Sequence, residues 1–275
     1  MKIINSTLSE KYEKLKKLIC GYGSVAVAFS AGVDSTLLLA VAAEVLGDKA
    51  VAVSVSADWV PGRESREATE FCEARGIRQI CLHVSADEIN GFADNPPDRC
   101  YLCKKALFTR IIEAALEQSV DCVVEGSNMD DLGDYRPGLQ AIAELGVKSP
   151  LREAGLTKAE IRELSRELGL PTADKPSFAC LASRIPYGET ITSEKLSMAD
   201  RGEQLLLEKG FHQFRVRVHG TLARIELLPE EMERLMSEPL RSEIYDEMKR
   251  IGFSYVALDL KGYRTGSLNE VLVQK

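Results

Sequence analysis

Apolar positions in the first 170 residues form short runs that alternate with segments of helical periodicity. Runs of four to seven apolar or small residues, with no polar face, are typical of strands buried on both sides of a parallel sheet. Their alternation with helices indicates a doubly wound α/β sheet. The predicted strands are 25–29, 50–56, 78–84, 121–125 and 148–151, and the principal predicted helices are 34–46, 61–75, 106–118 and 157–168.

The pattern changes after residue 170. Residues 170–188 contain three prolines and little periodicity, and a loop of this length in a folded protein is more often functional than idle. Beyond it we expect a helix at 193–209, a hairpin over 213–227, a helix at 239–251 and a strand at 255–260. This order predicts a smaller C-terminal α+β domain, so the expected domains are residues 1–180 and 181–275.

The first predicted strand runs into Ser30-Ala-Gly-Val-Asp-Ser35, directly before a predicted helix. Free N–H groups and the positive end of the helix dipole make such a terminus an anion site. The segment lacks the lysine of a Walker A loop. It resembles the pyrophosphate loop, Ser-Gly-Gly-x-Asp-Ser, of the ATP pyrophosphatase superfamily, with Ala31 in place of the first glycine. An ordinary strand-to-helix turn is the alternative.

A second polar segment, residues 126–138, follows the predicted strand 121–125. Ligands of open α/β sheets bind at the carboxyl ends of the strands. We therefore expect this loop and residues 30–35 to face one pocket.

Charge and composition narrow the functional classes. The net charge of −7 and pI near 5.3 argue against a broad nucleic-acid footprint, so no nucleic-acid partner is expected. No apolar run is long enough to cross a membrane, and the lysine-containing N-terminus does not resemble a signal peptide. These features predict a cytoplasmic protein without a membrane partner.

Three of the seven cysteines lie where chemistry is expected: Cys100 and Cys103 form a Cys-x-x-Cys, and Cys180 lies in the proline-containing loop. A redox dithiol needs only the pair, whereas a structural zinc site normally needs four ligands. An iron–sulfur cluster held by three thiolates would leave one iron open to an external ligand. Incidental thiols near a surface loop are the remaining alternative.

Taken together, the motifs resemble the LarE family, the ATP-dependent sulfur transferases of nickel-pincer nucleotide biosynthesis. The likeness extends over nearly the whole chain and includes Arg215-Val-Arg217. It rests on Ser30–Ser35, Cys100-Tyr-Leu-Cys103-Lys104, Gly126-Ser-Asn-Met-Asp-Asp131, Asp134–Gly138 and Cys180–Gly188.

The resemblance implies a reaction and its cofactors. ATP, with Mg²⁺, would adenylate a carboxylate of pyridinium-3,5-biscarboxylic acid mononucleotide, and sulfur would then replace AMP. Some members of the family sacrifice the cysteine matching Cys180, and others carry three cysteines thought to hold a 4Fe–4S cluster. The set of Cys100, Cys103 and Cys180 resembles the second type, and the family resemblance also implies a homo-oligomer, specifically a hexamer.

The resemblance and the residue chemistry together predict the site. The catalytic residues are expected to be Cys180, Cys100, Cys103, Asp34 and Lys104, with the three cysteines as metal ligands. The ATP site is expected at Ser30, Gly32, Asp34, Ser35, Ser56, Gly126, Asp131 and Arg136. The substrate is expected at Arg184, Glu203, Arg215, Arg217 and Glu226.

Several alternatives stay open at this point. The alternation of Arg215 and Arg217 with valines is equally typical of a half-exposed strand, and Glu203 and Glu226 by themselves suggest helix and strand surface. A related enzyme that thiolates or amidates tRNA would use the same loop. A regulator that binds ATP without cleaving it belongs to a different class, and it would leave the cysteines unexplained.

Overall fold

The apolar runs in the first part of the chain form a parallel sheet, as their pattern predicts. The computed structural model describes residues 6–133, 137–176, 180–264 and 266–270. The strands pair in the order β3-β2-β1-β4, all parallel. Their bounds are Val25–Ala28 for β1, Ala50–Ala57 for β2, Gln79–Val84 for β3 and Val123–Val124 for β4. The α/β fold class is therefore confirmed.

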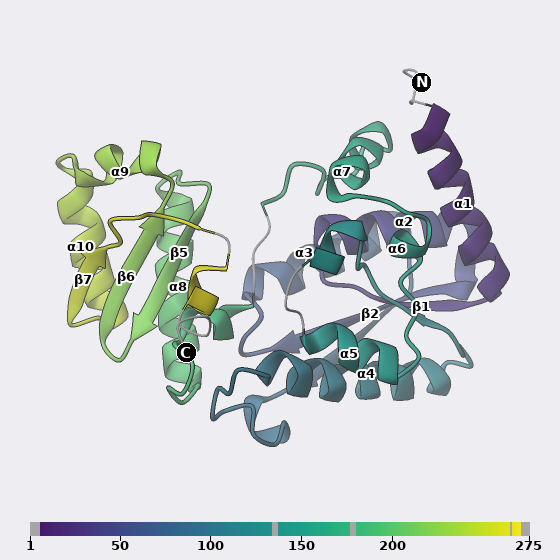
Figure 1. The fold of residues 1–275 in the computed structure, drawn as a ribbon, viewed down its shortest axis with the longest axis horizontal. Helices are drawn as coiled ribbons and strands as arrows, with labels where there is room; N and C mark the ends of the chain where they lie inside the picture. The colour runs from purple at the N-terminus through teal and green to yellow at the C-terminus, as the bar shows by residue number, and fades with distance from the viewer. Residues whose placement is uncertain (1–5, 134–136, 177–179, 265, 271–275) are drawn as a thin grey trace. The chain divides into compact units, whose positions relative to one another are not determined.

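Helices cover both faces of this sheet (Figure 1). On one side lie α1 (Ser6–Tyr22), α2 (Val33–Leu46), α3 (Gly62–Arg75), α6 (Pro150–Glu153) and α7 (Lys158–Glu167), and on the other α4 (Arg99–Glu117) and α5 (Pro137–Glu144). Alternate residues of β1 enter separate cores: Val25 and Val27 pack with α1 and α2, and Ala26 packs with α4. Burial on both faces explains why the strand sequences show no polar side.

One predicted strand is wrong. Residues 148–151 contribute only an isolated parallel bridge between Lys148 and Val124, and helix α6 begins at Pro150. Proline has no N–H to donate to a ladder but is well suited to the first helical turn, so the helix prevails. The predicted helix cap at 157 is confirmed, because the Thr157 hydroxyl accepts from the Glu160 N–H and the Glu160 carboxylate accepts from the Thr157 N–H.

The C-terminal part forms a three-stranded sheet in the order β5-β6-β7. Strands β5 (Phe214–His219) and β6 (Leu222–Leu227) are the predicted hairpin, and β7 (Tyr255–Leu258) pairs parallel to β6. Helices α8 (Ser193–Glu208) and α10 (Leu240–Ile251) agree with the prediction, whereas α9 (Pro229–Met236) was not predicted. The mixed sheet with its helices is the expected α+β arrangement (Figure 1).

Contacts between residues divide the chain into two compact units. The first comprises Met1–Ala57, Gly62–Val84 and Cys100–Ser177, and the second comprises Asp58–Pro61, Ser85–Arg99 and Phe178–Lys275. Cys180 belongs to the second unit, with the C-terminal sheet. The domain limits at residues 180 and 181 stay a prediction.

Candidate functional site

The turn between β1 and α2 provides an anion site at the carboxyl edge of the sheet. Gly32 precedes α2 and offers no capping side chain, so the first N–H groups of the helix have no side-chain partner from the cap. The hydroxyl oxygens of Ser30 and Ser35 lie 3.2 Å apart, and that of Ser35 donates to the Gly32 carbonyl at 3.2 Å. Backbone N–H groups and hydroxyls at a helix N-terminus are suited to a phosphate.

Ala31 explains why this loop favours glycine. Its φ of +52° lies in the left-handed region, which costs a residue with a Cβ about 1–2 kcal/mol. The turn nevertheless forms, and the Lys175 ammonium donates to the Ala31 carbonyl at 2.9 Å. The methyl group is therefore accommodated at a cost in backbone strain.

The second polar loop packs directly against the first, as expected for two loops at one sheet edge. A Cβ added to Gly126 would lie 3.1 Å from both the Asp34 Cβ and the Ser35 backbone nitrogen, so a side chain here would push the start of α2 away by a few tenths of an ångström. The Asn128 amide donates to Asp34 Oδ1 at 3.1 Å. The sequence identified the glycine but not the asparagine.

A buried carboxylate shapes the second loop. Glu125, only 6% exposed at the end of β4, accepts from the Ser127 N–H at 3.1 Å, from the Ser127 hydroxyl at 2.8 Å and from the Ser149 hydroxyl. Asp131, predicted to contact the nucleotide, accepts from the Asn128 N–H at 2.9 Å. Both acids hold the loop in the conformation that brings Asn128 to Asp34.

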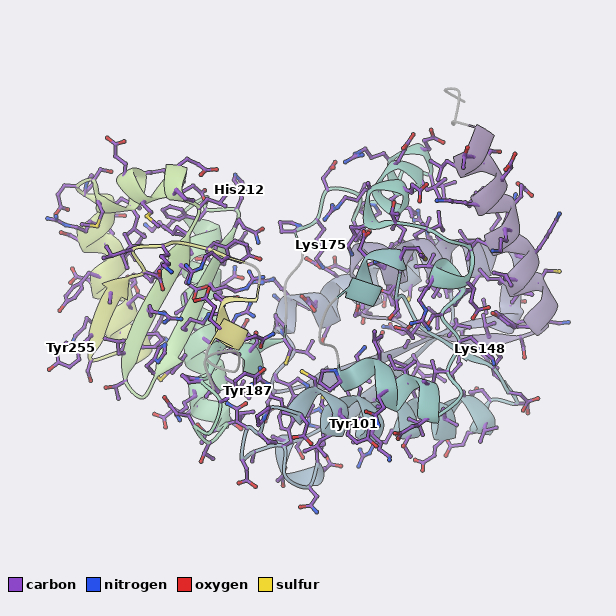
Figure 2. All side chains as sticks on the ribbon, viewed as in Figure 1. Tyr101, Lys148, Lys175, Tyr187, His212 and Tyr255 are labelled. Carbon is purple, nitrogen blue, oxygen red and sulfur yellow. The ribbon has the colours of Figure 1, made fainter. Side chains whose placement is uncertain are left out.

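Two lysines that the sequence analysis missed reach this edge from distant segments. The Lys158 ammonium forms an ion pair with Asp34 Oδ2, and its backbone N–H donates to Asp130 at 2.8 Å. Lys175, labelled in Figure 2 on the loop that follows α7, pairs with Glu67 and with the Ala31 carbonyl. Lys158 lies inside a capping box, a pattern that gives no functional signal, whereas Lys175 lies in the proline-containing loop already suspected of function.

The Cys-x-x-Cys lies in the first turn of α4, because this helix begins at Arg99, seven residues before the predicted start. Positions three apart share one helix face, which brings Cys100 and Cys103 to the same side. Cys100 is exposed and Cys103 is partly exposed. Lys104 packs its aliphatic chain on α5, where a Cβ at Gly138 would lie 2.7 Å from the Lys104 Cδ.

In the second unit, Cys180 is exposed and directly precedes a 3-10 turn, Leu181–Arg184. Its carbonyl accepts from the Ser183 hydroxyl at 2.7 Å and from the Arg184 guanidinium at 3.3 Å. Among the residues described, no group of three or more His, Cys, Asp or Glu side chains is arranged to hold a metal ion.

The predicted substrate residues form a buried charge cluster around this turn. Arg184 and Glu203 are both fully buried and form a two-pronged ion pair at 2.7 and 2.9 Å. Arg217 pairs with Glu226 at 2.9 and 3.0 Å, and its guanidinium also donates to the Ser183 carbonyl at 2.6 Å. The alternatives of a half-exposed strand and of surface glutamates are therefore wrong, because these residues are at most 5% exposed.

Electrostatics of the cluster leave an excess of positive charge. Burial, the largest single influence, raises the pKa of Glu203, but the charge and hydrogen bonds of Arg184, together with Arg215 and the Val216 N–H, outweigh it and hold the pKa below its usual range. Burial, together with the neighbouring Arg184 guanidinium, lowers the pKa of Arg215 to about 10. The Arg215 guanidinium lies 5.0 Å from the centre of the Tyr263 ring. Arginines 184, 215 and 217 with two glutamates make a site suited to an anion.

Ser56 is exposed at the carboxyl end of β2, and Arg136 lies outside the described residues. Trp59 is buried against Phe92, with ring centres 4.6 Å apart, and belongs to the core of the second unit. No helix within the described ranges has the length and apolar character needed to cross a membrane.

Comparison with known proteins gives relatives that cover almost the whole chain. The chain is 34% identical over 273 residues to the pyridinium-3,5-bisthiocarboxylic acid mononucleotide synthase of Lactiplantibacillus plantarum, covering 98% of this chain and 97% of the relative. It is 40% identical to an uncharacterized protein of Synechocystis, covering 97% and 100%. A component of the glutamine-hydrolyzing GMP synthase of Archaeoglobus fulgidus is 25% identical, covering 91% and 89%. No family model matches the chain.

Proposed function

Because the chain belongs to the LarE family, that of the pyridinium-3,5-bisthiocarboxylic acid mononucleotide synthase, we propose that it inserts sulfur into a pyridinium carboxylate at the expense of ATP. The substrate is pyridinium-3,5-biscarboxylic acid mononucleotide. One carboxylate oxygen attacks the α-phosphorus of ATP and pyrophosphate leaves. Sulfur then attacks the carbonyl carbon, and AMP leaves with the oxygen, giving a thiocarboxylate.

The loop at the start of α2 supports the activation step. Ser30, Gly32 and Ser35 present hydroxyl and N–H groups to the departing pyrophosphate. Asp34 would hold Mg²⁺, because one carboxylate plus the phosphates of the nucleotide is the usual way this ion is bound. Mg²⁺ would neutralise the charge that develops on the leaving group, while Lys158, paired with Asp34, supplies a second positive charge at the same edge.

The observation that carries the proposal is the bond between Arg184 and the Cys180 carbonyl. It fixes the backbone of the sulfur-bearing residue beside three buried arginines. Those arginines suit the phosphate and the free carboxylate of the pyridinium nucleotide through charge-assisted hydrogen bonds. The proposed sulfur donor and the proposed anion-binding residues thus belong to the same unit of the protein.

Cys100, Cys103 and Cys180, whose thiols are at least partly exposed, would supply the three ligands of a 4Fe–4S cluster with one open iron. Such a cluster would supply sulfide that is ionised near neutral pH. Without it, Cys180 itself would attack the acyl adenylate. Cleavage of its Cβ–Sγ bond, with loss of the α-proton, would then leave dehydroalanine and transfer the sulfur to the product.

Pyrophosphate release from ATP tests the function. Release that requires the pyridinium biscarboxylate mononucleotide is expected; release that requires bulk tRNA would indicate a tRNA-modifying enzyme. Tight ATP binding without release under either condition would indicate a regulator.

The sulfur source needs a separate experiment. Anaerobic reconstitution should yield iron and labile sulfide that are lost in Cys100→Ala but retained in Cys20→Ala, which removes an exposed thiol from α1. An active, iron-free protein that turns over once per chain and becomes lighter by the mass of one hydrogen sulfide would instead identify Cys180 as the sacrificed donor.

We also propose a cytoplasmic homo-oligomer, a hexamer by family resemblance. The reducing cytoplasm would keep the seven cysteines as thiols. Tyr255, labelled in Figure 2, lies on edge strand β7, whose outer edge has no neighbouring strand among the described residues and could pair with another copy of the chain. Light scattering of the purified protein gives the oligomeric state directly.

A further inference from the structure

A cavity of about 570 Å³ lies in the first unit, between α2, α3 and the loop that follows α7. Its volume falls within the range of small-molecule sites. Ala31 lines it from the turn before α2, Thr36 from α2 and Phe71 from α3. The loop contributes Pro171, Thr172 and Lys175.

The cavity is separate from the phosphate groups of the ATP loop. None of the residues proposed to bind the nucleotide lines it, although it contacts the same loop through Ala31. Successive helical residues are rotated by about 100°, so Thr36 points away from Asp34, which faces the sheet edge. An occupant would therefore lie behind the loop that grips pyrophosphate.

Two buried hydroxyls without a hydrogen-bond partner among the described residues indicate that the cavity binds a ligand. Thr36 is 0% exposed and Thr172 is 8% exposed, and neither Oγ1 atom has a hydrogen-bond partner in the described part of the chain. Buried polar groups in folded proteins are almost always bonded, so each exception calls for an explanation. Both residues line the cavity, and a ligand there can bond both hydroxyls.

The remaining lining defines the ligand. Phe71, with Ala31, Ala74 and Pro171, supplies apolar surface, and the Arg75 guanidinium lies 4.5 Å from the centre of the Phe71 ring. The rim carries the carboxylates of Glu67, Glu70 and Asp174 against the cations of Arg75 and Lys175. Because Lys175 already binds Glu67 and the Ala31 carbonyl, the rim disfavours a phosphate.

We propose that this cavity binds an uncharged heteroaromatic compound of nucleoside size. The ring packs on the apolar wall near Phe71, and its polar atoms bond the Thr36 and Thr172 hydroxyls.

Calorimetric titration of adenosine tests the site in the presence of Mg²⁺ and saturating α,β-methylene ATP, which blocks the nucleotide site. We expect one equivalent of adenosine to bind. Thr36→Val and Thr172→Val should each weaken this binding about fivefold, as expected for the loss of one hydrogen bond. AMP should bind the cavity more weakly than adenosine because of its phosphate.

Thr69→Val is the matched control, because the Thr69 hydroxyl on α3 donates to the Ser65 carbonyl at 3.3 Å and does not line the cavity. This variant should bind adenosine like the wild type. Without ligand, Thr36→Val should melt about 2–4 °C higher, since it removes an unsatisfied buried hydroxyl.

Three results would overturn the proposal: no binding at millimolar adenosine, binding that the ATP analogue abolishes, or binding that both valine variants leave unchanged. None of them bears on whether the protein transfers sulfur, because the titration contains no pyridinium substrate. The two proposals can therefore fail independently.

Discussion

The buried pair of Arg184 and Glu203 provides a quantitative test of the charge cluster. Glu203→Gln removes the negative charge but keeps the side-chain shape. Glu203 accepts two hydrogen bonds from Arg184 and one from the Val216 N–H at 3.1 Å, and both members of the pair are 0% exposed. Removing one partner strands the other charge in the interior, so we expect the free energy of unfolding to fall by about 3–5 kcal/mol.

Urea denaturation at pH 7 measures this loss. The double variant Arg184→Met/Glu203→Met then distinguishes the cost of an unpaired buried charge from the stability that the ion pair itself contributes. The double variant should lose much less than Glu203→Gln, because two apolar side chains leave no charge behind. The exposed pair of Arg241 and Glu238 on the surface is the control, and Glu238→Gln should cause no measurable change.

The pH dependence of the free energy of unfolding provides an independent test of the same pair. The pKa of Glu203 is lower in the folded protein than in the unfolded chain, so its contribution to stability is present above the unfolded pKa. That contribution is lost as the pH falls through the folded pKa, and the difference in stability between wild type and Glu203→Gln should shrink on acidification. A loss below about 1 kcal/mol at pH 7, or one independent of pH, would refute the buried, charged pair.

Three further changes probe the ATP loop. Lys158→Met removes the positive charge beside Asp34 and should slow substrate-dependent pyrophosphate release at least about tenfold, with an unchanged melting temperature. Gly126→Ala places a methyl group 3.1 Å from the start of α2, and should weaken the binding of Mg²⁺–ATP about tenfold in a calorimetric titration. Ala31→Gly relieves a φ of +52°, which offsets the lost methyl packing and the added freedom of the unfolded chain, so urea denaturation should show a change below about 0.5 kcal/mol.

Each of these three substitutions has a matched control variant. Lys49→Met alters an exposed lysine beyond the far end of α2 and should retain full activity. Gly62→Ala meets nothing closer than 3.9 Å and should bind ATP normally. Ala28→Gly lies in a strand without positive φ and should destabilise the protein by about 1 kcal/mol or more. If a loop variant shows the same activity, ATP affinity or stability as its control, the role given to that loop residue is contradicted.

The local pattern of polar and apolar residues was sufficient to predict most of the fold. The apolar runs at 25–29, 50–56 and 78–84 predicted three strands within one or two residues, because a strand buried on both faces leaves no alternation to misread. The predicted strand at 148–151 was wrong, since four residues with a proline in third place do not distinguish a strand from the first turn of a helix. The start of α4 was also placed too late.

The sequence by itself identified the pyrophosphate loop and the family, and it predicted a role for Cys100, Cys103 and Cys180, because motifs at fixed spacing reflect local chemistry. Only the tertiary structure decided what surrounds them. Lys158 reaches Asp34 across 124 residues, and Glu203 and Glu226, which resemble surface positions, are buried ion-pair partners. The physical reason is that burial and charge pairing depend on which distant segments the topology brings together. A local pattern of polar and apolar residues does not indicate which segments these are.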